Sequence, residues 1–423
     1  MCLTIPGKII SIHSGFAIVE NGKRQDKVNI ELISDAKIGD WILHATNLAI
    51  HKISEIEARE IIDLLEDKYQ KVDTDKLLVR FKKIIAKVKV KKDKLSKNEI
   101  IYLLSLSKKE ETETLYAEAN TLRKDVLEDF VCIHGIIEFS NYCNNNCLYC
   151  GIRKDSIIKR YRMSQKEIID AVKTAVDDEG YKLIVLQSGE DYGYTDEDII
   201  NIVSEIKKRF RVFVFISVGE RSKKFYQRAH AAGASGSLFR FETSNGIIYK
   251  KLHPGHSLES RLTCLQDQID SKYYLASGGL IGLSEQREED LANDLLLIKK
   301  LEIPMLSSGP YLKAEGTPLA KGTTNKEKLR LTLNYMAVAR LMMPDIKIPV
   351  TTALETLDRK NGRHRGLLAG ANALMFNITP KKYRNDYGIY DHKYIEREKV
   401  WQKYGLFKGE ESWEMIEEKL KII

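Results

Sequence analysis

The chain has 423 residues, of which 43% are hydrophobic and 30% are charged, an ordinary composition for a globular protein of more than one domain. It has neither a signal peptide nor an apolar run of transmembrane length, which predicts a cytoplasmic protein without membrane contacts whose six cysteines stay reduced and available to a metal. The net charge of +8 is spread widely. Lysines gather at 76–97, but they alternate with apolar residues and lack aromatic stacking partners, so a solvated helix face is favoured over a nucleic-acid-binding arm.

Residues 1–75 are predicted to form a small, OB-like β-barrel domain that ends in a helix. Asn21-Gly22 is a strong hairpin signal between apolar-rich runs. Ser54-Glu55-Ile56-Glu57 is a capping box that opens the helix, which is predicted to continue to about Tyr69. The predicted strands are Gly7 to Ile12, Phe16 to Glu20, Lys27 to Leu32 and Trp41 to Leu43.

Two stretches of this region carry recognisable motifs, namely Met1 to Lys8 (MCLTIPGK) and Gly39 to His44 (GDWILH), the latter followed by Ala49-Ile50. Both resemble the HypC/HupF family of hydrogenase-formation chaperones. The resemblance implies that Cys2 and His44 together hold an iron that carries cyanide and carbonyl ligands. Taken alone, Cys2 is an ordinary residue near a chain end and His44 a surface histidine at the end of a strand.

Residues 76–130 are rich in Lys and Glu, and their apolar residues, such as Phe81, Ile84, Ile85 and Val88, recur with helical spacing. The region is predicted to be a helical connector that extends the following domain at its N-terminus.

From residue 131 to residue 423, strand-like runs alternate with amphipathic helices, which predicts a parallel (β/α)8 barrel of the TIM type. The helices include Thr195 to Arg209, Arg287 to Lys300 and Asn325 to Met343. In such a barrel, the C-terminal ends of the strands form the face that carries the chemistry. The strands are predicted to end near Ser140, Gly189, Ser217, Phe241, Gly278, Ser308, Thr352 and Phe376.

The strongest chemical signal is the loop after the first of these strands, where Cys143, Cys147 and Cys150 are spaced by three and then two residues. Thiolates favour zinc or iron–sulfur clusters. A closed zinc site needs a fourth ligand, but the next cysteine is Cys264 and the nearest histidine, His134, lies back inside the strand. Three thiolates in one loop suit a 4Fe–4S cluster with one open iron. The alternative, three unrelated thiols or a disulfide with one cysteine left over, is disfavoured by the compact spacing.

This spacing, with the aromatic Tyr149 just before the third cysteine, resembles the signature of the radical S-adenosylmethionine (SAM) superfamily. The resemblance implies that the open iron chelates the amino and carboxylate groups of SAM and that Tyr149 backs the adenine. It also implies that an electron from the cluster cleaves SAM and releases a 5′-deoxyadenosyl radical. No cysteine follows Cys264, which predicts a single cluster.

Further motifs in this region are Ile137 to Asn141 (IEFSN), Arg160 to Met163 (RYRM), Leu186 to Asp191 (LQSGED), Ser217 to Glu220 (SVGE), Arg240 to Thr243 (RFET), Arg261 to Cys264 (RLTC), Gly316 to Leu319 (GTPL), Ile348 to Ala353 (IPVTTA) and Gly370 to Asn372 (GAN). Together they resemble the FeFe-hydrogenase maturase HydE family from about residue 90 nearly to the end. The resemblance implies an iron–carbonyl–cyanide–cysteine substrate, which is converted toward the di-iron subsite of the hydrogenase active cluster. The implied partners are other maturases or the hydrogenase apoprotein, and an electron donor such as ferredoxin or flavodoxin.

The resemblance and the residue chemistry together assign roles at the strand ends. Ser188-Gly189-Glu190 is expected to hold the SAM ammonium, and Arg261 to pair with the SAM carboxylate through its guanidinium fork. Arg240 and Glu242 are expected to alternate on the fourth strand and to share one face, with Glu242 taking a ribose or amino group of SAM. The alternative for each residue is a purely structural role, either in the packing of the barrel or in a surface ion pair. The remaining predicted residues are Ser217 for SAM, and Gln187, Arg240, Thr351 and Thr352 for the substrate chamber.

Two stretches depart from the HydE pattern. Ser284-Glu285-Gln286 stands where Pro-Gly-Gln is usual, near the expected adenine site, and Leu354-Glu355-Thr356 replaces Met-Gly-Thr, which predicts a carboxylate near the substrate chamber.

The fusion suggests that the HypC-like domain carries an iron unit and presents it in cis. Two rival functions stay open. One is a radical amino-acid mutase like methylornithine synthase, and the other is a non-catalytic scaffold or chaperone whose cluster is structural.

Overall fold

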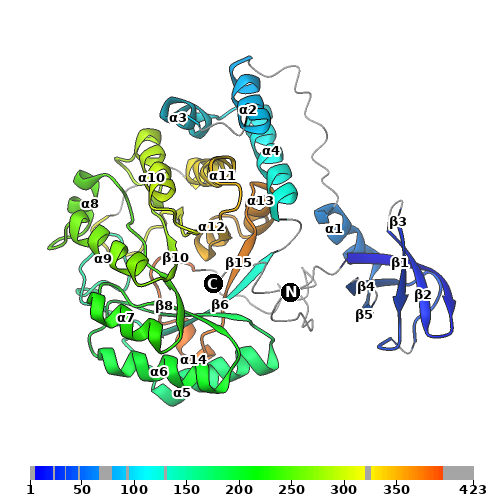
Figure 1. Cartoon of the computed structure of the whole chain (residues 1–423), viewed down its shortest axis with the longest axis horizontal. Coiled ribbons are helices and arrows are strands. Elements are labelled where there is room, and N and C mark those ends of the chain that lie inside the picture. The colour runs from blue at the N-terminus through cyan, green and yellow to red at the C-terminus, as the bar shows by residue number, and fades with distance from the viewer. Residues whose placement is uncertain are drawn as a thin grey trace. The chain divides into compact units, whose positions relative to one another are not determined.

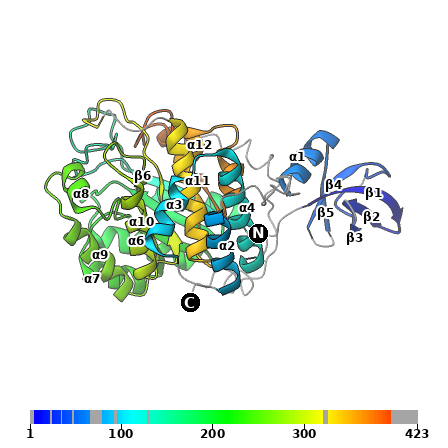
Figure 2. The same cartoon turned by 90° about the horizontal axis from the view of Figure 1, so that it is seen from above.

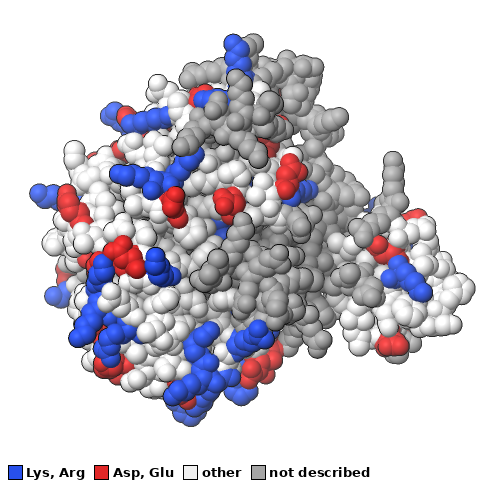
Figure 3. Space-filling model, in the orientation of Figure 1, with Lys and Arg blue, Asp and Glu red and all other residues white. Residues whose placement is uncertain are grey.

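The computed structural model describes residues 5–21, 24–33, 35–45, 48–65, 79–91, 95–127, 131–319 and 325–393, which fall into two compact units. The first unit lies mainly within residues 1–71, and the second takes up most of the chain from residue 72 to residue 395. No helix in these described ranges is long and apolar enough to cross a membrane. Basic and acidic side chains intermingle on the face drawn in Figure 3.

The first unit is a closed five-stranded barrel followed by a helix (Figure 1). Its strands follow the order β1-β2-β3-β5-β4, and neighbouring pairs are antiparallel except β3 with β5. Ile9, Val19, Val28 and Ile42 are among the buried side chains of its core. The elements are β1 Ile5–His13, β2 Phe16–Asn21, β3 Arg24–Asn29, β4 Trp41–Ala45, β5 Leu48–Ile53 and α1 Glu55–Leu65.

The predicted small barrel with a C-terminal helix is present, and so is the capping box. The Ser54 amide donates to the Glu57 carboxylate at 2.7 Å, and the Glu57 amide donates to Ser54 Oγ at 3.2 Å. The third strand ends at Asn29 and not at Leu32, because the Asn29 side chain accepts a hydrogen bond from the Glu31 amide at 2.8 Å and turns the chain. The sequence does not predict β5, because apolar and polar residues do not alternate along Leu48–Ile53. In the structure, Ala49 is the one fully buried side chain of this strand.

Three helices precede the barrel of the second unit: α2 Val79–Lys91, α3 Lys97–Ser105 and α4 Lys109–Leu127. Helices α3 and α4 lie along α11, Asn325–Met342 (Figure 2). Asn334 of α11 joins them, since its Nδ2 donates to the carbonyls of Leu104 and Leu106 at 3.0 and 2.9 Å and its Oδ1 accepts from the Tyr116 hydroxyl at 2.7 Å. The helical prediction for this region is confirmed, and α3 and α4 form part of the outer layer around the barrel.

The second unit is built on eight parallel strands in the order β12-β10-β9-β8-β7-β6-β15-β14. The two outer strands approach each other where the Leu306 amide donates to the Lys347 carbonyl at 2.8 Å, so the barrel is nearly closed. The short parallel pair β11 and β13 stands apart from this sheet. The strands are β6 Cys132–Ser140, β7 Leu183–Ser188, β8 Phe213–Ser217, β9 Ala234–Leu238, β10 Tyr274–Ser277, β11 Leu280–Ile281, β12 Met305–Leu306, β13 Gly309–Pro310, β14 Pro349–Val350 and β15 Ala373–Asn377.

Helices follow the strands and cover the outside of the barrel (Figure 1). The predicted helices at 195–209, 287–300 and 325–343 agree with α6, α10 and α11, and Thr195 caps α6 by accepting from the Asp198 amide. The other helices are α5 Gln165–Lys173 with the π-helical turn Thr174–Asp178, α7 Lys223–Ala231, α8 Gly246–Leu252, α9 Leu258–Asp270, α12 Thr352–Leu357, α13 Gly362–Leu368 and α14 Lys381–Arg384; α6 spans Asp196–Arg209 and α10 spans Glu288–Lys300.

Candidate functional site

The C-terminal ends of the barrel strands surround a cavity of about 290 Å³. Its wall combines the loop after β6 with the ends of β7, β8 and β15 and the segments that follow β9, β12 and β14. All the barrel residues that the sequence predicts for the site lie on this wall: Cys143, Cys147, Tyr149, Cys150, Gln187, Ser188, Gly189, Glu190, Ser217, Arg240, Glu242, Arg261, Thr351 and Thr352.

Arg160 and Asn141 hold the cysteine loop in shape. The Arg160 guanidinium donates to the carbonyls of Asn141 and Ile152 at 2.5 and 2.8 Å and to further carbonyls of the same loop. The Asn141 side chain accepts from the Tyr161 amide at 2.7 Å. Because a guanidinium carries five donors in a rigid fork, one side chain fixes both ends of the loop.

The end of β7 packs closely against the cysteine loop at Gly189. A Cβ at this position would lie 2.2 Å from the carbonyl oxygen of Tyr142 and 2.8 Å from the Cβ of Cys143. The Asn144 amide donates to the Glu190 carbonyl at 2.9 Å and joins the two segments. Glycine is therefore required at 189 for the loop to lie where it does.

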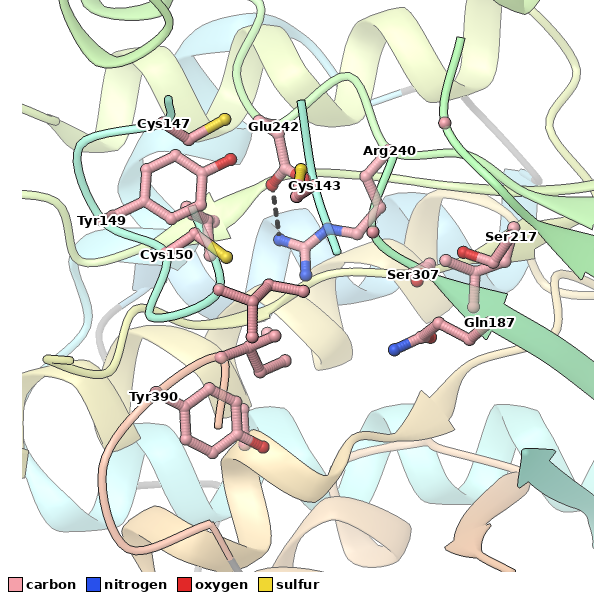
Figure 4. A pocket seen from close by; sticks show the side chains of 18 of the residues that line it. Cys143, Cys147, Tyr149, Cys150, Gln187, Ser217, Arg240, Glu242, Ser307 and Tyr390 are labelled. Atoms are coloured by element: carbon pink, nitrogen blue, oxygen red, sulfur yellow. Dashed lines mark ion pairs between the residues drawn. The ribbon is translucent and has the colours of Figure 1, made fainter. Parts of the chain in front are cut away.

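The three thiols face the cavity, and burial opposes their ionisation. Figure 4 shows the sulfur atoms of Cys143, Cys147 and Cys150 turned toward the same region. Burial raises the pKa of all three thiols, to about 12 for Cys150, and the other two thiols raise that of Cys147 further. A cationic iron cluster would supply the positive charge that stabilises three thiolates here, so the donor set fits such a cluster.

Among the residues that the structure describes, no three His, Cys, Asp or Glu side chains are placed to hold a metal ion together. In an iron–sulfur cluster, each cysteine binds a different iron atom, so the thiolates do not have to converge on one ion.

Charged groups line the cavity beside the cysteines. Arg261 of α9 contacts Glu190 Oε1 at 3.1 Å and Glu220 Oε1 at 3.2 Å, and its guanidinium lies 3.8 Å from the centre of the Phe239 ring. The second carboxylate oxygen of Glu190 is buried and has no hydrogen-bond partner among the described residues. A cationic group of a ligand can pair with this oxygen. Gly219 permits the arrangement, because a Cβ there would lie 1.8 Å from Glu190 Cγ.

The expectation that Arg240 and Glu242 alternate on the fourth strand is wrong. The strand β9 ends at Leu238, and both residues lie beyond it, where Glu242 has a left-handed φ of +65°. Regular pairing with β10 ends at Leu238, and Glu242 makes only an isolated bridge to Gly279. The Thr243 amide donates to the Phe241 carbonyl at 2.8 Å, which makes a tight turn centred on Glu242. The two side chains still share the cavity and form an ion pair at 3.0 Å (Figure 4).

Tyr149 is fixed by a histidine that the sequence does not single out. The Tyr149 hydroxyl lies 2.9 Å from Nε2 of His253, and Nδ1 of His253 lies 2.8 Å from the Tyr249 carbonyl. Because a carbonyl only accepts, Nδ1 carries the hydrogen and Nε2 accepts from Tyr149. Burial lowers the pKa of His253, which favours this neutral form. The Tyr249 ring stacks on His253 with centroids 4.1 Å apart.

Two tyrosines from the segment after β15 complete the wall on which Gln187 and Thr352 lie. Gln187 Nε2 donates to the Tyr387 hydroxyl at 3.4 Å, and the Thr352 hydroxyl lies 2.9 Å from that of Tyr390. Figure 4 places Gln187 and Tyr390 away from Cys147. The sequence does not mark the tyrosines, because neither belongs to a motif and only the fold brings them to the strand ends.

The two departures from the HydE pattern have different outcomes. The expectation that Glu355 places a carboxylate near the chamber is wrong, because Glu355 is buried outside the cavity wall and accepts from Nη2 of Arg363 at 2.9 Å. At the other site, Gln286 closes the turn. Its Oε1 accepts from the Gly282 amide at 2.8 Å, and its Nε2 donates to the carbonyl of the wall residue Leu280 at 2.8 Å.

In the first unit, His44 of β4 is completely buried, which excludes a surface histidine. It lies opposite Ile5 in the antiparallel pair of β1 and β4, and its Nε2 is 3.3 Å from where a Cβ of Gly7 would stand. Cys2, the other predicted iron ligand, lies outside the described residues, so the joint site stays a prediction.

Comparison with known proteins gives two family matches, to the HupF/HypC family over residues 1–65 and to the radical SAM superfamily over residues 137–298. The [FeFe] hydrogenase maturase subunit HydE of Thermotoga maritima is 41% identical over 297 residues, which cover 70% of this chain and 84% of that relative. The 3-methylornithine synthase of Methanosarcina acetivorans is 30% identical over 307 residues, which cover 72% of this chain and 86% of that relative. The crystal structure of methylornithine synthase matches with a TM-score of 0.69 and 26% identity, over 80% of this chain and 99% of that one.

Proposed function

We propose that this chain, which belongs to the family of the [FeFe]-hydrogenase maturase HydE, acts on an iron species that carries carbonyl, cyanide and cysteine. The chain is a radical SAM enzyme of hydrogenase maturation, and the proposal concerns its substrate and the roles of its residues. The observation that carries the proposal is that three thiols, the Arg261–Glu190 pair and the Arg240–Glu242 pair line one cavity.

When bound, a 4Fe–4S cluster and SAM supply an electron and the 5′-deoxyadenosyl radical that is the reactive group. Cys143, Cys147 and Cys150 would bind three irons of the cluster. Hydrogen bonds from Arg160 and to Asn141 would hold the loop that carries these cysteines. Tyr149 would back the adenine, and its hydrogen bond to His253 would fix the orientation of the ring.

The SAM amino acid would bind beside the end of β7. The free oxygen of Glu190 would accept from the ammonium group, next to the backbone of Ser188-Gly189. Arg261 would pair with the SAM carboxylate through Nη2, because its Nε and Nη1 already donate to Arg240, Glu190 and Glu220. Glu242 would accept from a ribose hydroxyl, and Ser217 would supply a further polar contact.

The substrate chamber would be formed by Gln187, Arg240, Thr351 and Thr352. A guanidinium and neutral hydroxyl and amide groups suit a substrate with anionic cyanide and carboxylate groups. The tyrosines after β15 help to enclose the cavity, and this would keep water and other hydrogen donors from the reactive group.

The first 75 residues would act as an iron carrier in cis, with 76–130 as an extension and 131–423 as the catalytic barrel. We place an iron with carbonyl and cyanide ligands on Cys2 and His44, from which it is delivered to the barrel or to a partner. A tether raises the effective concentration of the carrier at the barrel. Infrared bands of bound cyanide and carbonyl that disappear in Cys2→Ala would support this role, and unchanged bands would refute it.

We further propose that the protein works in the cytoplasm, receives electrons from ferredoxin or flavodoxin, and cooperates with other maturases or with the hydrogenase apoprotein.

The test of the enzymatic role is anaerobic reconstitution of the cluster, followed by SAM, dithionite and an assay for 5′-deoxyadenosine, with Cys147→Ala as the control. We expect cleavage by the natural chain alone. Absence of cleavage by a fully loaded protein would favour a scaffold. The 30% identity to a 3-methylornithine synthase supports an amino-acid mutase as the second candidate, which lysine-dependent turnover would reveal.

A further inference from the structure

Glu242 combines a cavity carboxylate with a left-handed backbone, a combination that non-glycine residues rarely adopt. Its backbone is bound on both sides, because its amide donates to the Gly278 carbonyl at 3.1 Å and its carbonyl accepts from the Leu280 amide at 2.8 Å. A strained residue persists only where its surroundings hold it in place. The surroundings that hold Glu242 therefore decide whether its carboxylate stays in the cavity.

Two carboxylates of helix α10, one helical turn apart, bind the residues Ser244 and Asn245, which follow the tight turn at Glu242. Asp294 Oδ1 accepts from both the amide and the hydroxyl of Ser244, at 2.7 and 2.5 Å. Asp290 Oδ1 accepts from Nδ2 of Asn245 at 2.8 Å. Residues four apart share one face of a helix, so the two carboxylates form a clamp on Ser244-Asn245.

Asp294 is completely buried, and its Oδ2 has no hydrogen-bond partner among the described residues. It also lies against the segment after β10 that binds the Glu242 backbone. A Cβ on Gly279 would stand 3.0 Å from Asp294 Oδ2 and 2.7 Å from the Glu242 carbonyl oxygen. A buried, half-satisfied carboxylate destabilises the folded chain. What this one contributes is geometry, since it fixes the backbone two residues after Glu242.

We propose that Asp294 is a positioning residue for SAM, which acts through the clamp on Ser244-Asn245 to keep the Glu242 carboxylate in the cavity. The inference rests on the SAM-binding role proposed above for Glu242.

The test is the dissociation constant of SAM, measured by calorimetry on the anaerobic, cluster-loaded full chain without reductant, so that no turnover occurs. We expect Asp294→Ala to weaken SAM binding about tenfold, the size that follows from losing the two hydrogen bonds that Asp294 accepts from Ser244. Asp294→Asn keeps the Oδ1 acceptor and should bind SAM within about twofold of the natural chain. The matched control is Glu111→Ala, which removes a buried carboxylate from a different helix, α4. It should leave SAM binding unchanged.

A double-variant cycle with Glu242→Gln separates this inference from the proposed function. If Asp294 acts through Glu242, Asp294→Ala should have little further effect once Glu242 is replaced. The inference would be overturned if the losses of SAM affinity in the two single variants added fully in the double variant, or if Asp294→Ala bound SAM as tightly as the natural chain. Unchanged binding in Glu242→Gln would instead refute the proposed role of Glu242. If Asp294→Ala does not fold, Ser244→Ala removes one of the two donors to the same oxygen. A loss that vanishes in the Glu242→Gln background then supports the clamp, and unchanged SAM binding overturns it.

Discussion

Replacing Gly189 by alanine tests the packing of the cysteine loop on the end of β7. The new Cβ would stand 2.2 Å from the Tyr142 carbonyl oxygen and 2.8 Å from the Cβ of Cys143. Both neighbours belong to the loop itself, so no flexible side-chain end can move away to make room. To reach ordinary contact at 3.4 Å, the Tyr142 carbonyl has to move by about 1.2 Å. Metal sites tolerate shifts of only about 0.2 Å in their ligands, so a displacement of this size should disturb Cys143.

We expect Gly189→Ala to lower the free energy of unfolding by about 1–3 kcal/mol, the usual cost of overpacking. It should also bind less iron and sulfide per chain after anaerobic reconstitution. Urea unfolding and iron analysis measure the two effects. Gly246→Ala is the matched control, because a Cβ at that position meets nothing within 4 Å. Full iron content and unchanged unfolding in Gly189→Ala would refute the packing argument, and equal losses in both variants would show that the effect is not local.

Three further substitutions test separate parts of the second unit. Arg160→Lys keeps the charge but loses the fork that binds several loop carbonyls, so cluster occupancy after reconstitution should fall, and unchanged occupancy would contradict this. Burial raises the pKa of Asp294 to about 7, so the folded chain retains a proton that the unfolded chain loses near pH 4, and stability should fall as the pH rises from about 4 to 7. Asp294→Asn should remove that part of the pH dependence in urea unfolding at a series of pH values, and an identical profile would refute the assignment. Glu355→Ala leaves the buried Arg363 without its carboxylate and should cost about 3–5 kcal/mol of stability, but it should spare SAM cleavage by the folded protein, because Glu355 lies outside the cavity wall.

The barrel and the cysteine loop could be predicted because their signals are local. Buried parallel strands are continuous apolar runs, and each predicted strand end lies within three residues of the observed one. The three cysteines lie within eight residues of sequence, so their spacing alone indicates a cluster. His253 and Tyr387 could not be found in this way. His253 meets Tyr149 across 104 residues of sequence, and Tyr387 meets Gln187 across 200.

The wrong expectations arise where one backbone dihedral or one buried partner overrides a regular pattern. Alternation along a strand predicts that Arg240 and Glu242 share one face, and they do share the cavity, but the regular ladder of β9 ends at Leu238 and Glu242 makes only an isolated bridge to Gly279 with a left-handed φ. The motif position of Glu355 predicts a cavity carboxylate, but Arg363, eight residues later, pairs with it away from the cavity. The end of β3 is different. Asparagine side chains readily accept a hydrogen bond from the amide two residues later and turn the chain, so Asn29 itself indicates where the strand ends.

The paired charges of the cavity also bear on how SAM can enter it. Arg261 is already engaged, since its Nε donates to the Arg240 carbonyl at 2.8 Å and its Nη1 to Glu190 and Glu220 at 3.1 and 3.2 Å. Within the described residues, its Nη2 makes no hydrogen bond, so two of the five guanidinium donors remain for a ligand. The SAM carboxylate could therefore pair with Arg261 through Nη2 while both glutamates hold the guanidinium in place. Binding would then add a charge pair to an ordered site without breaking one, which keeps the desolvation and ordering costs of binding low.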